Sequence, residues 1–311
     1  MNLIQFVIIL FYGIISVIFF LWKENKIYDK KKSMIIASSS TIFAILLSVF
    51  TNIANKESFD IASSILGMIT NFYFTYNLAS GKLSIKKFIK SGVAILIFLT
   101  SSIYQIIPIS LFGINKAMLT TELSTYLTMF SDIFVLTFLI LIYYNDIKCG
   151  IIKAKKNFYE FFDTSFKIWT LGFIGMVVSN LIINLVFPEA IAGNENSVQS
   201  MIDVSPIIML VCAGIVAPII EELTFRQAFR DIFKNKWLFI LSSGIIFGGL
   251  HVIFSYQSLI DFIYVIPYSI LGIAFAYMYD KTDNVLSGIL MHFIHNTAII
   301  CFSILTGMIL L

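Results

Sequence analysis

Apolar stretches of roughly 20 residues, separated by short polar segments, follow one another along the whole chain. A stretch of this length can cross the hydrocarbon core of a bilayer as a helix. The pattern predicts an all-α, polytopic helical membrane protein with about ten transmembrane helices. We expect the spans at residues 3–22, 33–54, 61–80, 90–111, 123–144, 168–188, 206–225, 237–255, 259–279 and 285–308.

The basic residues provide a test of this assignment, because they should gather in alternate loops. All 21 Lys and Arg residues except Lys56 and Lys116 fall in or beside every second connecting segment. Cytoplasmic loops carry an excess of Lys and Arg, so we predict that these segments are cytoplasmic and that both termini lie outside. The segment Glu189–Ser205 has acidic residues and no Lys or Arg, and is expected to be an outer loop.

The composition agrees with a membrane setting. Hydrophobic residues make up 59% of the chain and charged residues only 13%, whereas soluble domains carry about 25% charged residues. Three scattered cysteines give no CxxC pair and no disulfide framework. No basic patch with interleaved aromatic residues is present, so the expected partner is the lipid bilayer and not a nucleic acid. Asn71, Asn77, Asn180 and Asn184 are expected to form hydrogen bonds between helices.

Ionisable side chains gather in the predicted spans of the last third of the chain. The three histidines, His251, His292 and His295, all lie there, as do the adjacent Glu221 and Glu222. Placing such groups in a membrane costs about 2.5–3.5 kcal/mol each on insertion scales, so they indicate a functional site by default. The alternative is a polar cluster that only holds helices together.

Helical depth predicts that these groups meet. If the seventh helix continues past Arg226 to a turn near Asn235, Glu222 lies roughly 20 Å from that turn at 1.5 Å per residue. By the same measure His251 and His292 lie roughly 22 and 17 Å from the same membrane face. Three neighbouring helices would therefore bring polar groups to a similar depth.

Spacing within each helix predicts how the side chains face. Glu222 and Arg226 are four residues apart and can form an ion pair, whereas Glu221 points about 100° away, toward the histidines. Two further pairs share a helix face, namely Phe247 with His251 and His292 with Asn296. His295 is offset to the other side of His292 and is expected at the edge of the cluster.

Such a set of groups suits the activation of a water molecule. A carboxylate and an imidazole can take its proton, while a second imidazole and an amide donate to a developing oxyanion. The alternative is a zinc site with Glu221, His251 and His292 as ligands and an open position for water. No HExxH motif is present, so the residues leave zinc and a metal-free mechanism equally open.

Three motifs resemble those of the CPBP family of intramembrane proteases, which includes type II CAAX prenyl endopeptidases and bacteriocin-processing or immunity proteins. They are Glu221-Glu222-x-x-x-Arg226, Phe247-x-x-x-His251 and His292-x-x-x-Asn296, within about residues 206–305. The resemblance implies that Glu221 is the catalytic glutamate and His251 its partner at the water. It implies that His292 and Asn296 form the oxyanion site, and that Glu222, Arg226 and Phe247 support them.

We therefore expect an N-terminal transmembrane extension (1–165), a sixth span with an outer loop (166–205) and a CPBP-like catalytic membrane domain (206–311). The expected function is hydrolysis of a peptide bond in a membrane-associated, lipidated or bacteriocin-type peptide or protein, in the plasma membrane of a bacterium. The alternative is a non-catalytic bacteriocin immunity or membrane scaffold protein of the same fold. A transporter would show inverted repeats in both halves, whereas the polar residues here concentrate in one.

Overall fold

The computed structural model describes residues 3–55, 60–115 and 118–307, all of whose regular elements are helices. Its contacts divide the chain into two compact units, Met1–Ile89 and Lys90–Leu311. The candidate site lies entirely in the second unit. The all-α fold is therefore confirmed for the part of the chain that is described.

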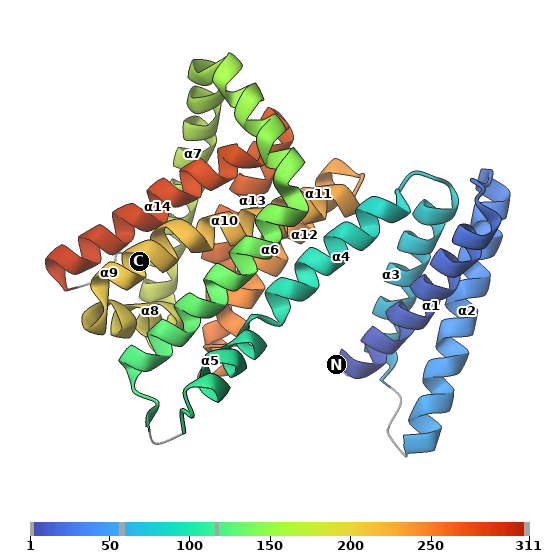
Figure 1. Cartoon of the computed structure of the whole chain (residues 1–311), viewed down its shortest axis with the longest axis horizontal. Coiled ribbons are helices and arrows are strands. Elements are labelled where there is room, and N and C mark those ends of the chain that lie inside the picture. Colours follow the sequence, from blue (N-terminus) through green and yellow to red (C-terminus); the bar gives the residue numbers. More distant parts are fainter. Residues whose placement is uncertain (1–2, 56–59, 116–117, 308–311) are drawn as a thin grey trace. The chain divides into compact units, whose positions relative to one another are not determined.

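The first unit is built on three helices that pack against one another, α1 (Leu3–Glu24), α2 (Lys30–Asn55) and α3 (Ile61–Ala79) (Figure 1). Buried polar groups join them: the Asn71 amide donates to the Ile9 carbonyl over 3.1 Å, and Thr41 donates to Asn71 Oδ1 over 3.1 Å. The interhelical role predicted for Asn71 is confirmed. Asn77 instead donates to the Tyr73 carbonyl of its own helix, so that expectation was wrong for its amide group.

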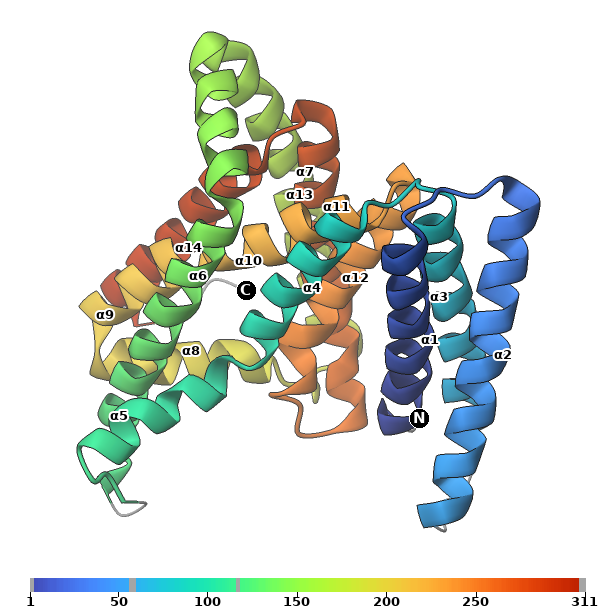
Figure 2. The ribbon, with the colours of Figure 1, turned by 45° about the vertical axis from the view of Figure 1, so that its right-hand side comes forward.

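Helix α4 (Ile85–Leu99) leads into the second unit and is followed, after a bend of 56°, by the short helices Ser101–Gln105 and α5 (Ile106–Leu111). Two long helices come next, α6 (Thr121–Lys156) and α7 (Phe158–Val186). Both extend beyond the predicted spans at the end where they join, because the helical pattern continues through the basic residues there. Figure 2 shows them rising together to this junction.

The last third of the chain forms the rest of the second unit. Helix α8 (Gly193–Val204) precedes one helical rod made of α9 (Pro206–Val211), α10 (Ala217–Glu221), α11 (Phe229–Ile232) and the turns between them. Three further helices complete the unit, α12 (Lys236–Ile253), α13 (Val265–Thr282, preceded by a 3₁₀ turn, Leu259–Tyr264) and α14 (Val285–Thr306).

Helices α12 and α13 approach closely because glycines line their contact. A Cβ atom at Gly244 would lie 2.7 Å from the Ile273 backbone nitrogen, and one at Gly248 would lie 2.7 Å from that of Ser269. Small residues of this kind let membrane helices pack backbone against backbone. This contact fixes the position of His251, one turn further along α12.

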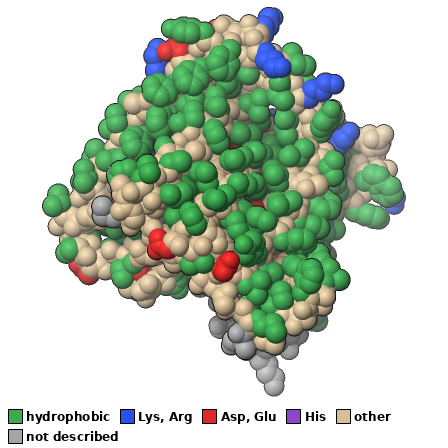
Figure 3. Space-filling model, turned by 60° about the vertical axis from the view of Figure 1, so that its left-hand side comes forward, with side chains coloured by type: hydrophobic (Ala, Val, Ile, Leu, Met, Phe, Trp, Pro, Cys, Tyr) green, Lys and Arg blue, Asp and Glu red, His purple; other side chains and the backbone are tan. Residues whose placement is uncertain are grey.

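Eight helices of the described residues are long and apolar enough to cross a membrane, or nine when the bent pair after Ile85 counts as one span. The predicted polytopic helical membrane protein is confirmed, and its count of about ten is close to this number. The difference is α3, which forms as predicted but carries many buried polar side chains, among them Ser63, Ser64, Asn71 and Thr75. The face of the protein drawn in Figure 3 is largely apolar, with Lys and Arg gathered toward one end. The chain is an integral membrane protein.

Candidate active site

The rod that carries the two glutamates is not a uniform α-helix. Cys212–Val216 and Glu222–Ala228 are π-helical, and the helix continues to Ile232 before a turn that Asn235 caps. The predicted continuation past Arg226 is thus confirmed. π-Helical turns are rare and often occur at functional sites, because they leave backbone groups without regular helical partners.

Neighbouring helices donate to the carbonyl groups of these wider turns. The Asn296 amide donates to the Ala213 carbonyl over 2.8 Å, and Ser243 donates to the Phe225 carbonyl over 2.7 Å. These contacts tie the rod to α14 on one side and to α12 on the other. The orientation of Glu221 and Glu222, which lie between them, is therefore fixed by tertiary contacts.

Glu222 and Arg226 form the ion pair that the spacing predicted. Arg226 Nε lies 3.3 Å from Glu222 Oε2, and both side chains are fully buried. The guanidinium also donates to the Gly272 carbonyl over 3.2 Å, and it lies over the Phe247 ring, 4.5 Å from its centroid. A buried charge requires compensation of this kind, and aromatic faces suit a planar guanidinium.

His292 lies between the two glutamates. Its Nδ1 atom is 3.1 Å from Glu222 Oε1, and its Nε2 atom is 3.6 Å from Glu221 Oε2. A carboxylate only accepts, so the proton on Nδ1 is donated to Glu222 and Nε2 is directed toward Glu221. A distance of 3.6 Å is too long for a hydrogen bond and leaves the Nε2 atom available to another partner.

A glycine makes room for this arrangement on α14. Gly288 lies one turn before His292, and a Cβ atom there would collide with Glu222 Oε2. The buried carboxylate therefore occupies the space of a missing side chain. This observation links Gly288 to the geometry of the ion pair.

His251 is oriented by its own helix and by an aromatic neighbour. Its Nδ1 atom lies 2.9 Å from the Phe247 carbonyl, and its ring stacks on Tyr268 with 4.7 Å between centroids. Because a carbonyl only accepts, Nδ1 carries the proton, and in the neutral ring Nε2 is an acceptor. The same spacing brings the Phe247 ring against His251, with 4.4 Å between the ring centroids.

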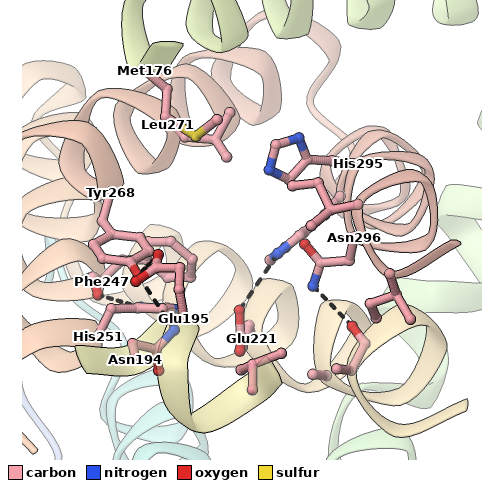
Figure 4. A pocket seen from close by; sticks show the side chains of 16 residues that line it. Met176, Asn194, Glu195, Glu221, Phe247, His251, Tyr268, Leu271, His295 and Asn296 are labelled. Atoms are coloured by element: carbon pink, nitrogen blue, oxygen red, sulfur yellow. Dashed lines mark hydrogen bonds and ion pairs between the residues drawn. The ribbon is translucent and has the colours of Figure 1, made fainter. Parts of the chain in front are cut away.

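These side chains line one cavity of about 240 Å³ (Figure 4). Of the sequence-predicted residues, the cavity brings together five, namely Glu221, Phe247, His251, His292 and Asn296. Glu222 and Arg226 lie behind them in the protein interior. His295 also lines the cavity, with its ring against Trp169 and Phe173, so it lies at the border as expected.

Sequence reasoning missed the contribution of α8. Its segment was expected to be a loop, yet Asn194 and Glu195 at its N-terminus line the cavity beside Tyr268 of α13 (Figure 4). The apolar Val198, Met201 and Ile202 recur at helical spacing and are the signal that could have predicted this helix. The pKa of the Glu195 carboxyl is raised to about 7 because the group is largely buried.

The zinc alternative requires three side chains that converge on one point. Among the described residues, no three His, Cys, Asp or Glu side chains lie together in a way that could hold a metal ion. The Nδ1 atoms of both His251 and His292 are engaged with protein acceptors, which leaves Nε2 of each ring as the atom that could bind a metal. Glu221, however, lies within ion-pair distance of His292 alone among the two histidines. The residues as they lie do not fit a zinc site.

Comparison with known proteins bears on this part of the chain. Residues 203–298 match the family model described as type II CAAX prenyl endopeptidase Rce1-like. The family resemblance is confirmed. This Rce1-like region contains all seven residues of the three motifs, and Asn194 and Glu195 lie just before it.

Curated relatives extend the similarity beyond the Rce1-like region. UPF0177 protein YxdF of Lactococcus lactis subsp. lactis (strain IL1403) is 28% identical over 50% of this chain and 85% of its own length. UPF0177 protein YbdI of the same strain is 27% identical over 57% of this chain and 96% of its own. YdiL of Bacillus subtilis (strain 168), whose name describes a membrane peptidase, is 28% identical over 34% of this chain and 41% of its own. No solved structure matches the chain.

Proposed function

We propose that the protein is an intramembrane endopeptidase that hydrolyses a peptide bond of a membrane-embedded or lipidated peptide, with water activated by Glu221. The observation that carries the proposal is the position of His292 between Glu221 and Glu222, at a cavity that His251 and Asn296 also line. The similarity to type II CAAX prenyl endopeptidases and to a protein named as a membrane peptidase supports the same class of reaction.

In this mechanism a water molecule donates a hydrogen bond to His251 Nε2, and Glu221 takes its other proton. The hydroxide adds to the carbonyl carbon of the scissile bond. His292, in its protonated form, donates from Nε2 to the oxyanion, and the buried Glu222 carboxylate stabilises the imidazolium. Asn296, which is held by the Ala213 carbonyl, contributes its second amide hydrogen.

The reaction then ends with cleavage of the C–N bond. The tetrahedral intermediate collapses, and the proton taken up by Glu221 passes to the leaving amine. One water molecule is consumed, its hydroxyl joining the new carboxyl group and its proton the new amine. Glu222, Arg226 and Phe247 act by holding His292 and His251 in place.

We further propose that the protein resides in the plasma membrane of a bacterium with both termini outside. The distribution of Lys and Arg between alternate segments supports this orientation. Bacterial relatives support the setting. Helix α8, which covers the cavity, then lies on the outer side, so a substrate approaches the site from that side or from the lipid.

The function is tested with purified protein in proteoliposomes and a pool of synthetic single-span peptides, half of them carrying a farnesylated cysteine. We expect cleavage by the wild type, detected by mass spectrometry, and a loss of about 10²–10⁴-fold in rate for Glu221→Gln. The control is Glu189→Gln, an exposed carboxylate outside the cavity. A folded Glu221→Gln protein with full activity would exclude this mechanism. The alternative is the non-catalytic immunity role. It would be indicated if the protection that the protein gives, or its binding to a partner, survived joint substitution of Glu221, His251 and His292.

A further inference from the structure

A second cavity, of about 440 Å³, adjoins the one just described. It has α12 on one side and α4, with the turn that follows α4, on the other. The first cavity lies among α7, α8, α13 and α14. Three residues line both cavities, namely Asn194, Glu221 and His251. The proposed base and its partner thus stand in the wall between two chambers, so a peptide bond placed at Glu221 would extend one flank into each.

The α4-side chamber has an apolar part of its wall, made of Phe98, Leu99, Phe225, Leu250 and Phe254. Ser101 and Ser102 complete the wall beside the three shared residues. Leu99 and Phe254 are 55% and 84% exposed, so the chamber reaches an apolar part of the surface, which we expect to face lipid. An apolar side chain that enters from the lipid would be favoured here.

The other chamber has acidic groups and no cation to match them. None of its lining residues is Lys or Arg, and Arg226, which lies behind the cavity, is already paired with Glu222. Glu195 accepts from the Tyr268 hydroxyl with one carboxyl oxygen. The other oxygen, Oε2, is buried and has no hydrogen-bond partner. A buried acceptor without a donor calls for a ligand that supplies one.

The start of α8 is held firmly enough to present this group. Gly193 approaches the Ser255 carbonyl so closely that a Cβ atom would collide with it. The Ile191 amide donates to Asp261 over 2.8 Å, and Asn194 donates to the Tyr268 hydroxyl over 3.3 Å. Glu195 is therefore fixed beside Tyr268, which stacks on His251 (Figure 4).

We propose that Glu195 determines specificity by binding a Lys or Arg side chain on one side of the scissile bond, while the α4-side chamber takes a bulky apolar residue on the other side. This inference rests on the proposed peptidase function, since it assigns two subsites to the same site. The raised pKa of Glu195 fits a carboxyl that can bind a cation, because burial disfavours its charged form. Binding of a basic side chain supplies the missing donor and restores the charge.

The test uses sets of single-span peptides that differ at one position beside an apolar residue. This position holds Lys, norleucine or Glu. Binding is measured on the Glu221→Gln background, and kcat/KM on proteins with an intact Glu221. We expect the Lys peptide to be preferred over norleucine by about tenfold or more, as for a hydrogen bond to a charged group. Glu195→Gln should remove the preference for the Lys peptide, and Glu195→Lys should replace it with a preference for the Glu peptide. The control Glu189→Gln should keep the preference for Lys.

The two measurements separate the two proposals. If no peptide is cleaved but the Lys preference in binding depends on Glu195, the peptidase function fails and the subsite stands. If peptides are cleaved and Glu195→Gln keeps the full Lys preference, the subsite is wrong and the peptidase function stands. Equal binding of Lys and norleucine peptides by the Glu221→Gln protein would also overturn the subsite. Tyr268→Phe serves as a second variant. It removes the hydroxyl that donates to Glu195 and accepts from Asn194 but leaves the Glu195 carboxyl in place, so it should retain the preference.

Discussion

The Nδ1 atom of His292 lies 3.1 Å from Oε1 of Glu222, although 70 residues separate them. The contact joins α14 to the rod that carries both glutamates and fixes which ring nitrogen faces the cavity. Because Glu222 also pairs with Arg226, a single buried carboxylate both balances a charge and orients a histidine. Removing it should therefore affect stability and activity together.

Glu222→Gln leaves Arg226 buried without its ion partner. Loss of one member of a buried pair costs about 3–5 kcal/mol, so we expect a clear fall in the free energy of unfolding. The double variant Glu222→Gln with Arg226→Met should recover much of it, because no unpaired charge remains. Thermal unfolding in detergent micelles measures the stability of the single and the double variant. A double variant as unstable as the single one would contradict this account.

Gly288→Ala tests the space that the Glu222 carboxylate occupies. The added methyl group would collide with Oε2, shifting the carboxylate and with it the His292 ring. A displacement of about 1 Å at a catalytic group can reduce a rate by roughly 10²-fold, and we expect a loss of peptidase activity of that order. Gly92→Ala is the matched helical control, since nothing lies within 4 Å of its Cβ position. Equal activity of the two variants would show that Gly288 has no such role.

The orientation in the membrane can be read from Cys149, which is exposed near the basic end of α6. In intact cells it should be protected from a membrane-impermeant maleimide and become reactive after the membrane is permeabilised. In a Cys149→Ser background, a cysteine placed by Ser197→Cys on exposed α8 should react in intact cells. Both experiments use Cys301→Ser protein. The reverse labelling pattern would invert the predicted topology.

The affinity for a basic peptide should depend on pH through Glu195. With a pKa raised to about 7, the carboxyl is mostly neutral at pH 6 and mostly charged at pH 8. The ratio of KM for the norleucine peptide to KM for the Lys peptide should therefore rise by about tenfold at most over this range. Glu195→Gln should make the ratio independent of pH.

The ratio of two peptides isolates Glu195 from the other titratable groups, which affect both peptides alike. Those that face the same chamber are Glu221, His251, Tyr268, His292 and His295. A ratio that changes equally with pH in the wild type and in Glu195→Gln would assign the effect to one of them.

Much of this protein is determined by its sequence alone. The apolar stretches specify helices because they have the length of a membrane-spanning helix, in which every backbone hydrogen bond is satisfied within one segment. The spacing of Glu222 and Arg226 specifies an ion pair, and that of Phe247 and His251 places their two rings on one helix face. These contacts are local, within four residues on one helix, so periodicity is sufficient to predict them.

Only the tertiary structure decided which groups face one another across helices. The π-helical turns around Glu221 rotate its neighbours away from ideal α-helical angles, so the partners of His292 could not be derived from 100° steps. Glu195 and Tyr268 come from segments 73 residues apart, and their meeting depends on how closely Gly193 approaches the end of α12. Sequence periodicity reports which face of a helix is polar, whereas the position of one helix on another depends on side-chain volumes at the contact.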